Sequence, residues 1–219
     1  MDNKISAFLL TYSDPLLGEV MGCDIHLLDE AATVADLMDA LDDFAAQYMA
    51  DCYGCDACCQ ERAPLTAADI PALAALLPQS DFPAHAVVSN FGKLDVTDGV
   101  TDIILRRGDD NCCCMLNTEG HFCNQWPARA FVCRSHFCLP RSKRLEELRQ
   151  AIVNAGENEL TRMLLKEEML GAPPVNGQKL CQQICAEDYP TSAISGILSY
   201  KDMLIRDVVS AELWQLLLA

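Results

Sequence analysis

The sequence predicts a mainly α-helical fold in which helices pack around a cysteine-rich core that includes a small β-hairpin or strand pair. Apolar residues recur at helical spacing in several segments, whereas β-branched runs are short and few. The cysteines are also clustered, since ten of the 13 lie between residues 52 and 138. With 219 residues, 51% of them hydrophobic, the chain is long enough to bury a substantial core.

We expect residues 1–219 to form a single domain with three parts. Residues 51–140 form a cysteine-rich core, for which the cysteine spacing described below predicts metal binding. A helical part precedes it at residues 1–50, and another follows at residues 141–219. The nearest feature to a domain edge is the segment 173–177, where prolines and a glycine end a predicted helix.

The first helix is predicted over about residues 28–49, where the apolar positions share one face. Thr33 and Asp36 have the spacing of a capping box within this range, so the helix can also begin there. A second helix is predicted to follow Thr66 as its N-cap, with Asp69 three residues later.

Strands are expected only between residues 81 and 110. Residues 86–88 and 101–106 are short β-branched runs bounded by Gly, Asp and Asn, which is typical of a strand pair.

The rest of the chain is predicted to be helical. Ser142 caps a helix through residue 155, Gly156 breaks it, and a further helix occupies residues 157–170. The last helix is predicted over residues 192–218, although Gly196 weakens its first turn.

The charge excludes several classes of partner. The chain has 32 acidic and 16 basic residues, a formal net charge of −16, which disfavours nucleic acid and anionic membrane surfaces. No apolar run reaches the length of a transmembrane helix, and the N-terminus lacks the pattern of a signal peptide. An odd number of cysteines, three of them consecutive, favours reduced thiols and therefore a cytoplasmic protein.

The first cysteine group has the pattern C-x2-C-x2-C-C and consists of Cys52, Cys55, Cys58 and Cys59. Two-residue spacing lets a tight loop direct several sulfurs at one centre, as in both zinc and iron–sulfur sites. Gly54 permits a close turn of the backbone there. Buried or redox-active cysteines are the alternative interpretation of this group.

The second group runs from Cys112 to Cys138 and also contains Cys113, Cys114, Cys123 and Cys133. Two arginines lie beside it, each placed to approach a cysteine if the segment is helical: Arg129 and Arg134. Arginines can donate charge-assisted hydrogen bonds to cluster sulfurs and lower thiol pKa values. Surface ion pairs in this acidic chain are the alternative.

These motifs resemble the YkgJ, or CxxCxxCC, family of zinc- or iron-chelating proteins. The resemblance covers roughly residues 52–138, and Trp126 and Ala130 replace the Tyr and Pro of the usual pattern. It implies metal ligation by the cysteines that match the pattern, with the two arginines in supporting positions. The matching residues are Cys52, Cys55, Cys58, Cys59, Cys113, Leu116, Cys123, Trp126, Arg129, Cys133 and Arg134.

Seven cysteines exceed the four ligands of one structural zinc, and a [4Fe–4S] cluster also takes four. The excess therefore suggests a cluster plus a second site, or ligands with redox-active neighbours, and an iron–sulfur cluster of the [4Fe–4S] type is preferred over zinc. Other positions stay open as extra ligands. These are Cys112, Cys114, Cys138, Cys181 and Cys185, with His121 and His136 as weaker candidates. Cys23 and His26 form an isolated C-x2-H pair, for which a core role is expected.

We expect a protein that acts in electron transfer, redox sensing or as an accessory to a protein partner. One branch of the family resembles flagellin lysine N-methylases, so an enzyme that modifies a protein substrate is the second hypothesis. A zinc-stabilised interaction module is the third. The chain contains no glycine-rich nucleotide-binding motif and no serine-hydrolase elbow, so the sequence assigns no reaction.

Overall fold

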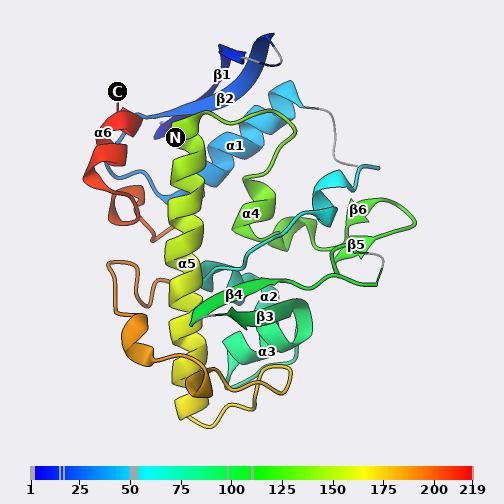
Figure 1. The fold of residues 1–219 in the computed structure, drawn as a ribbon. Helices are drawn as coiled ribbons and strands as arrows, with labels where there is room; N and C mark the ends of the chain where they lie inside the picture. The colour runs from blue at the N-terminus through cyan, green and yellow to red at the C-terminus, as the bar shows by residue number, and fades with distance from the viewer. Residues whose placement is uncertain are drawn as a thin grey trace. The chain divides into compact units, whose positions relative to one another are not determined.

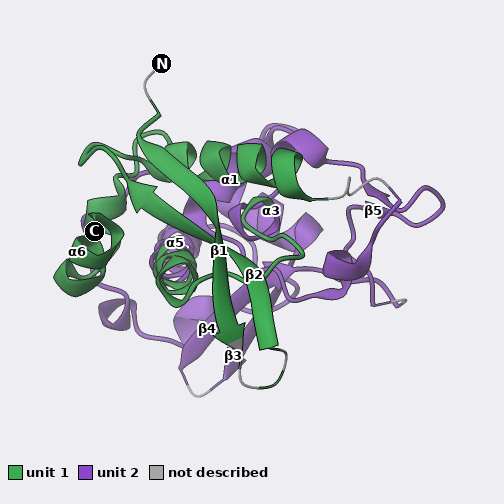
Figure 2. Cartoon of the chain, turned by 90° about the horizontal axis from the view of Figure 1, so that it is seen from above, with its two compact units in different colours: residues 1–51, 134–152, 200–219 green, residues 52–133, 153–199 purple. Residues whose placement is uncertain are grey.

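The computed structural model describes residues 3–14, 16, 18–49, 54–97, 99–109 and 111–218 (Figure 1). The chain divides into two compact units (Figure 2). Unit 1 comprises residues 1–51, 134–152 and 200–219, and unit 2 comprises residues 52–133 and 153–199. The boundaries do not follow the predicted three parts, and the single domain over residues 1–219 stays a prediction.

Unit 1 combines a long antiparallel hairpin with helices. Its elements are β1 (Ile5–Asp14), β2 (Gly18–Leu27), α1 (Val34–Tyr48), the first ten residues of α5 (Lys143–Met169), the short helix η6 (Ile205–Asp207) and α6 (Ala211–Leu218). The hairpin register pairs Ile5 with Leu27. The capping box predicted for α1 is confirmed, because Asp36 accepts the Thr33 N–H at 2.8 Å and Thr33 caps the helix.

Unit 2 holds most of the short elements. They are η1 (Ala57–Gln60), η2 (Ala67–Asp69), α2 (Ile70–Ala74), α3 (Pro83–Phe91), β3 (Gly92–Thr97), β4 (Val100–Leu105), β5 (Leu116–Asn117), β6 (Phe122–Cys123), η3 (Trp126–Ala128), α4 (Phe131–Arg134, whose last residue falls in unit 1), η4 (Leu180–Gln182) and η5 (Ala186–Asp188). Its core is an apolar cluster that includes Leu65, Ile70, Val87, Ile103 and Leu160.

The fold is mixed helix and strand rather than mainly α. The described residues contain three two-stranded antiparallel sheets, β1–β2, β3–β4 and β5–β6. The predicted strand at residues 101–106 is confirmed by β4, which pairs with β3. The prediction missed the β1–β2 hairpin because burial does not alternate along β2: Cys23, Asp24 and Ile25 are consecutive and all buried, at 0%, 6% and 0% exposure. Such a pattern lacks the alternation on which strand prediction depends.

Residues 86–88 are helical, so the strand predicted there is wrong. They lie inside α3, whose first turn is fixed by a carboxylate that is distant in sequence. Glu167 accepts the N–H groups of Ala84 and His85 at 3.1 and 2.9 Å. This cap satisfies orphan donors of the first turn, and Pro83 suits the first helical position. The tertiary contact therefore overrides the β propensity of the valines.

Helix α5 runs without a break from Lys143 to Met169, so the interruption predicted at Gly156 is wrong. The predicted N-cap is confirmed, since the Ser142 Oγ accepts the Leu145 N–H at 3.2 Å. Gly156 has a packing role instead. A Cβ at this position would lie 2.5 Å from the Thr66 Cβ, so only glycine lets the helix approach that residue.

The long C-terminal helix predicted over residues 192–218 is also wrong, because only α6 is an α-helix there. Gly196 has a φ of +82°, which ends any right-handed helix at that residue. Glu159 holds the resulting turn by accepting the Gly196 N–H at 2.9 Å and the Ser195 hydroxyl at 3.1 Å. None of the described helices is both long enough and apolar enough to cross a membrane.

Candidate metal centre

The first cysteine segment is a tight turn in unit 2. Cys58 and Cys59 lie in η1, and Cys55 precedes it, while Cys52 lies outside the described residues. Gly54 has a φ of +83°, as the sequence suggested for a backbone that turns closely at this point. The Cys59 N–H donates to the Asp56 carbonyl at 2.9 Å, which closes the turn and sets the direction of the segment.

The second cysteine segment follows β4 and continues through β5, β6 and α4. The Cys114 N–H donates to the Arg106 carbonyl at 2.9 Å, so the three consecutive cysteines run alongside the end of β4. Cys123 lies in β6 opposite Leu116 of β5. Cys133 lies in α4, and Asp69 holds the start of that helix by accepting the Phe131 N–H at 2.9 Å.

The backbones of the two segments lie side by side (Figure 1). The Cys113 N–H donates to the Cys59 carbonyl at 3.0 Å. The pKa of Cys59 is raised to about 12, chiefly by burial. The neighbouring thiols of Cys58, Cys113 and Cys123 contribute to the same increase. The structure thus brings together parts of both predicted ligand groups.

Cys133 completes this group of neighbours. Burial is the main reason that its pKa lies far above the ordinary value, and Cys113, Asp69, Cys123 and Cys58 add to the effect. Neighbouring thiols of this group thus disfavour ionisation, because nearby thiolates would repel one another. A bound cation would relieve that repulsion. We call the five residues the thiol cluster: Cys58, Cys59, Cys113, Cys123 and Cys133.

Cys114 behaves differently from its neighbour Cys113. The pKa of Cys114 is lowered to about 7, chiefly by a hydrogen bond donated by the Cys113 thiol. Burial opposes this decrease, and the nearby Arg106 guanidinium contributes to it. The same bond, together with burial, raises the pKa of Cys113. Cys114 is exposed, so its sulfur is the more readily ionised of the pair.

The donor chemistry of the thiol cluster fits a soft metal, because clustered thiolates suit zinc, Cu(I) and iron–sulfur clusters. Within the part of the chain that the structure describes, however, no three His, Cys, Asp or Glu side chains are arranged to hold one ion. The cluster therefore brings suitable donors together without forming a closed coordination sphere. The seven-cysteine ligand set stays a prediction, and one of its members, Cys52, is outside the described residues.

The remaining cysteines differ in their surroundings. Cys55 and Cys138 are exposed, and Cys112 is half-buried. Cys181 is exposed, and a hydrogen bond with Glu168 raises its pKa. Cys185 is exposed as well, and Glu187 raises its pKa in the same way.

Cys23 and His26 have structural surroundings in unit 1, as the sequence suggested. Cys23 is fully buried in β2, and burial raises its pKa to about 12. The His26 ring stacks on Phe8 with the ring centroids 4.8 Å apart.

The two arginines of the family pattern have different partners. The Arg129 guanidinium lies 3.5 Å from the centroid of the Trp126 ring, and its charge lowers the pKa of Cys123, although burial raises that pKa more. Arg134 instead donates to Asp42 at 3.1 Å and to Asp39 at 3.3 Å, both in α1 of unit 1. Of these two arginines, Arg129 is therefore the one whose charge acts on the thiol cluster.

Sequence reasoning missed the pairing of His121 with Asp56. The His121 Nδ1 lies 2.7 Å from the Asp56 Oδ2, which links the β5–β6 turn to the first cysteine segment. Asp56 stands within the C-x2-C-x2-C pattern, at a position to which the spacing rule assigns no role. The sequence suggests His121 only as a weaker ligand candidate, because its partner depends on the geometry of the β5–β6 hairpin.

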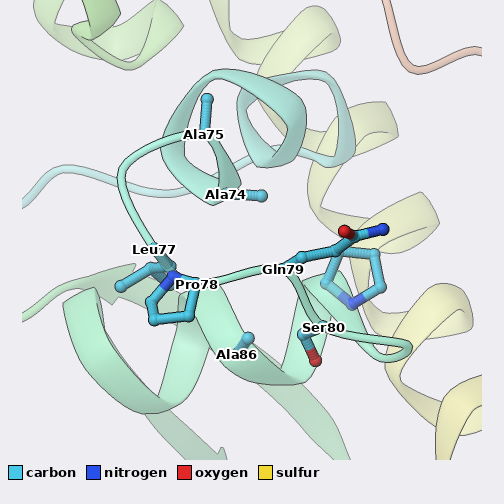
Figure 3. Close-up of a pocket in the computed structure, with 8 residues that line it drawn as sticks. Ala74, Ala75, Leu77, Pro78, Gln79, Ser80 and Ala86 are labelled. Carbon is cyan, nitrogen blue, oxygen red and sulfur yellow. The ribbon is translucent and has the colours of Figure 1, made fainter.

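A hollow with a volume of about 290 Å³ lies between α2 and α3, away from this chemistry (Figure 3). Its lining contains neither a cysteine nor a charged side chain, so it offers no thiolate or carboxylate to a metal. It is lined by Ala74, Ala75, Leu77, Pro78, Gln79, Ser80, Pro83 and Ala86.

Comparison with family models matches this chain to a family of metal-chelating domains. The model is CxxCxxCC, described as a "Putative zinc- or iron-chelating domain", and it matches residues 51–158. This range contains every cysteine of both groups and extends into α5, beyond the segment that the motifs alone had indicated. Comparisons with the curated proteins and with the solved structures give no match.

Proposed function

Residues 51–158 belong to the CxxCxxCC family of zinc- or iron-chelating domains, and we propose that they hold an iron–sulfur cluster of the [4Fe–4S] type. The observation that carries this proposal is the convergence of the thiol cluster. Cysteines from η1, β6 and α4 and from the loop after β4 come together although they are far apart in the sequence. Structural cysteines of a reduced protein have no need to meet in this way.

The number of donors exceeds what one centre uses. A structural zinc and a [4Fe–4S] cluster each take four cysteines, whereas the thiol cluster alone provides five and the family pattern provides seven, which suits a cluster with a second site or with redox-active neighbours. A bound iron–sulfur cluster would supply one-electron redox chemistry. Zinc remains the alternative cofactor, because the same soft donors bind it well.

The role proposed for the chain's own residues is to bind and tune the centre. Cys58, Cys59, Cys113, Cys123 and Cys133 would act as ligands, together with Cys52 and Cys55 of the family pattern. Arg129 would stabilise the negative charge of the ligated sulfurs, since its guanidinium already acts on Cys123. Trp126 holds that guanidinium by stacking and by accepting its Nε–H at the backbone carbonyl, 3.1 Å away.

We propose electron transfer, redox sensing or an accessory role in the cytoplasm, in contact with a protein partner. Cys55 and Cys58 are exposed, so this side of the centre is open to a partner. An enzyme that modifies a protein substrate, as in the methylase-like branch, is the alternative class. A zinc-stabilised interaction module is the other alternative, and the exposed Trp126, 47% accessible, is a contact such a module could use.

Metal and sulfide analysis of protein purified without oxygen distinguishes these proposals. Iron with an equal amount of acid-labile sulfide, and the broad visible absorption of a cluster, is the expected result. Zinc without sulfide would reject the cluster and favour the interaction module. Protein free of both metals, even after incubation with iron and sulfide or with Zn²⁺, would reject metal binding altogether.

A further inference from the structure

Among the contacts of the described residues, three hold the first cysteine segment against the second, and two of these involve one residue. The Gly54 N–H donates to the His121 carbonyl at 3.1 Å. The His121 ring contacts Asp56 at 2.7 Å. The third is the backbone hydrogen bond between Cys113 and Cys59. His121 therefore holds the first segment through both its backbone and its side chain.

The β5–β6 turn is built so that His121 points toward this segment. The Asn117 Oδ1 accepts the N–H groups of Glu119 and Gly120 at 3.1 and 2.8 Å, which fixes the turn. His121 then has a φ of +51°, a left-handed conformation that histidine adopts only occasionally. This unusual backbone places the carbonyl and the ring of one residue on the same neighbouring segment.

The pair also has a defined position relative to the thiols. Asp56 lies between Cys55 and Cys58, and His121 lies two residues before Cys123. Any change in the distance between the two partners therefore displaces cysteines of both groups. The His121 side chain is 52% exposed, which suits a residue that spans the surface of the centre better than one enclosed among the ligands.

We propose that Asp56 and His121 form a clasp that sets the separation of the two cysteine segments. His121 is then a positioning residue for the metal centre and not one of its ligands. This inference rests on the proposed function, because the clasp has a role only if the two cysteine segments bind a common metal centre. It extends that function by assigning a role to two residues outside the cysteine pattern.

The test compares Asp56→Asn and His121→Gln with the wild-type chain, using Co²⁺ as the probe. Cobalt binds soft thiolate sites, and its absorption bands report the number and type of its ligands. Each variant is expected to lose ~10–100-fold in Co²⁺ affinity, the usual effect of removing a group that orients ligands. The bands of the saturated variants should match those of the wild type, because every ligand remains.

Glu119→Gln provides the matched control. Glu119 is exposed on the same turn and its removal also lowers the negative charge by one, yet its side chain does not join the two segments. The Asp56→Asn, His121→Gln double variant should bind as weakly as either single variant, because the two residues act as a pair. Single variants whose Co²⁺ affinities lie within twofold of the Glu119→Gln control would overturn the proposal. A double variant whose loss in binding free energy equals the sum of the two single losses would overturn it as well.

A change in the cobalt bands of His121→Gln would also overturn the proposal, since it would make His121 a ligand.

Amide hydrogen exchange at Gly54 provides a measurement that needs no metal, because the Gly54 N–H is bonded to the His121 carbonyl. Exchange should be faster in both variants than in Glu119→Gln, and equal rates would contradict the clasp. A wild-type chain that binds no metal would reject the proposed function, while the exchange rates would still test the clasp.

Discussion

The main-chain N–H of Cys113 lies 3.0 Å from the carbonyl oxygen of Cys59 and donates a hydrogen bond to it. The bond joins two segments that the sequence separates by β3, β4 and three helices. A metal bound by thiols of both segments would close this long loop covalently. Metal binding and folding should therefore be linked, because closing a long loop lowers the entropy of the unfolded chain.

Metal removal is expected to loosen the region between Cys52 and Cys138. Without the metal, the two segments are held by a few hydrogen bonds, and the thiol cluster is protonated and no longer joins them through a common ion. Limited proteolysis of protein treated with a chelator, followed by mapping of the fragments, measures this effect. Faster cleavage confined to this region is the expected result, and identical cleavage with and without metal would contradict it.

Gly156→Ala is expected to destabilise the protein by about 1–2 kcal/mol, although the same change usually stabilises a helix. The reason is the added Cβ, which would lie 2.5 Å from the Thr66 Cβ and would force α5 and Thr66 apart. Chemical denaturation measures the free energy of unfolding. Asn154→Ala, on an exposed position of α5, is the control and should be neutral or stabilising. A stabilising Gly156→Ala would show that the two elements do not approach closely.

Glu157 is expected to make stability depend on pH. Burial raises its pKa from 4.5 to about 7, although the bond from the Ile103 N–H, 2.8 Å long, lowers it, and Asp102 raises it further. The folded chain thus binds this proton more tightly than the unfolded chain. The resulting stabilisation is complete below about pH 4.5 and is lost as the pH rises through about 7.

Glu157→Gln removes this titration and keeps the oxygen that accepts the Ile103 N–H. The difference in unfolding free energy between variant and wild type should shift in favour of the variant by about 1–2 kcal/mol from pH 5 to pH 8, after discounting for the exposed part of the side chain. Denaturation curves at both pH values give this difference. A constant difference would mean that Glu157 has an ordinary pKa.

Arg129→Gln and Arg134→Gln are expected to impair different properties, metal binding in the first variant and stability in the second. Arg129 acts on Cys123, so its loss should weaken metal binding. Arg134 pairs with Asp42 and Asp39, so its loss should lower the unfolding free energy by about 1 kcal/mol and leave the metal content unchanged. Metal content and denaturation of both variants test this contrast. Loss of metal from Arg134→Gln would give that arginine a role at the sulfurs.

The features that the sequence predicted correctly depend on residues close together in the chain. Thr33 with Asp36, and Thr66 with Asp69, are local pairs, and both form the predicted contacts. The cysteine spacing is equally local, and it led to the family that the comparison then identified. Such patterns are readable because the chain connectivity itself brings the partners together.

The predictions that failed concern segments whose structure depends on residues far away in the sequence. The helix at residues 86–88 relies on Glu167, and the turn at Gly196 relies on Glu159. The contact between His121 and Asp56 likewise requires the β5–β6 hairpin to be folded. Local propensity cannot reveal these contacts, because each satisfies backbone or side-chain groups with a residue that the fold alone brings near.

Metal content of Cys113→Ser, beside the wild type and Cys181→Ser, tests the central claim most directly. Cys113 is a neighbour of three other thiols of the cluster, whereas Cys181 is an exposed cysteine whose thiol is bonded to Glu168. All three proteins are purified without oxygen, and iron, zinc and sulfide are measured per chain. We expect the wild type and Cys181→Ser to hold equal metal and Cys113→Ser to lose most of it. Equal metal in all three proteins would contradict a centre built on the thiol cluster.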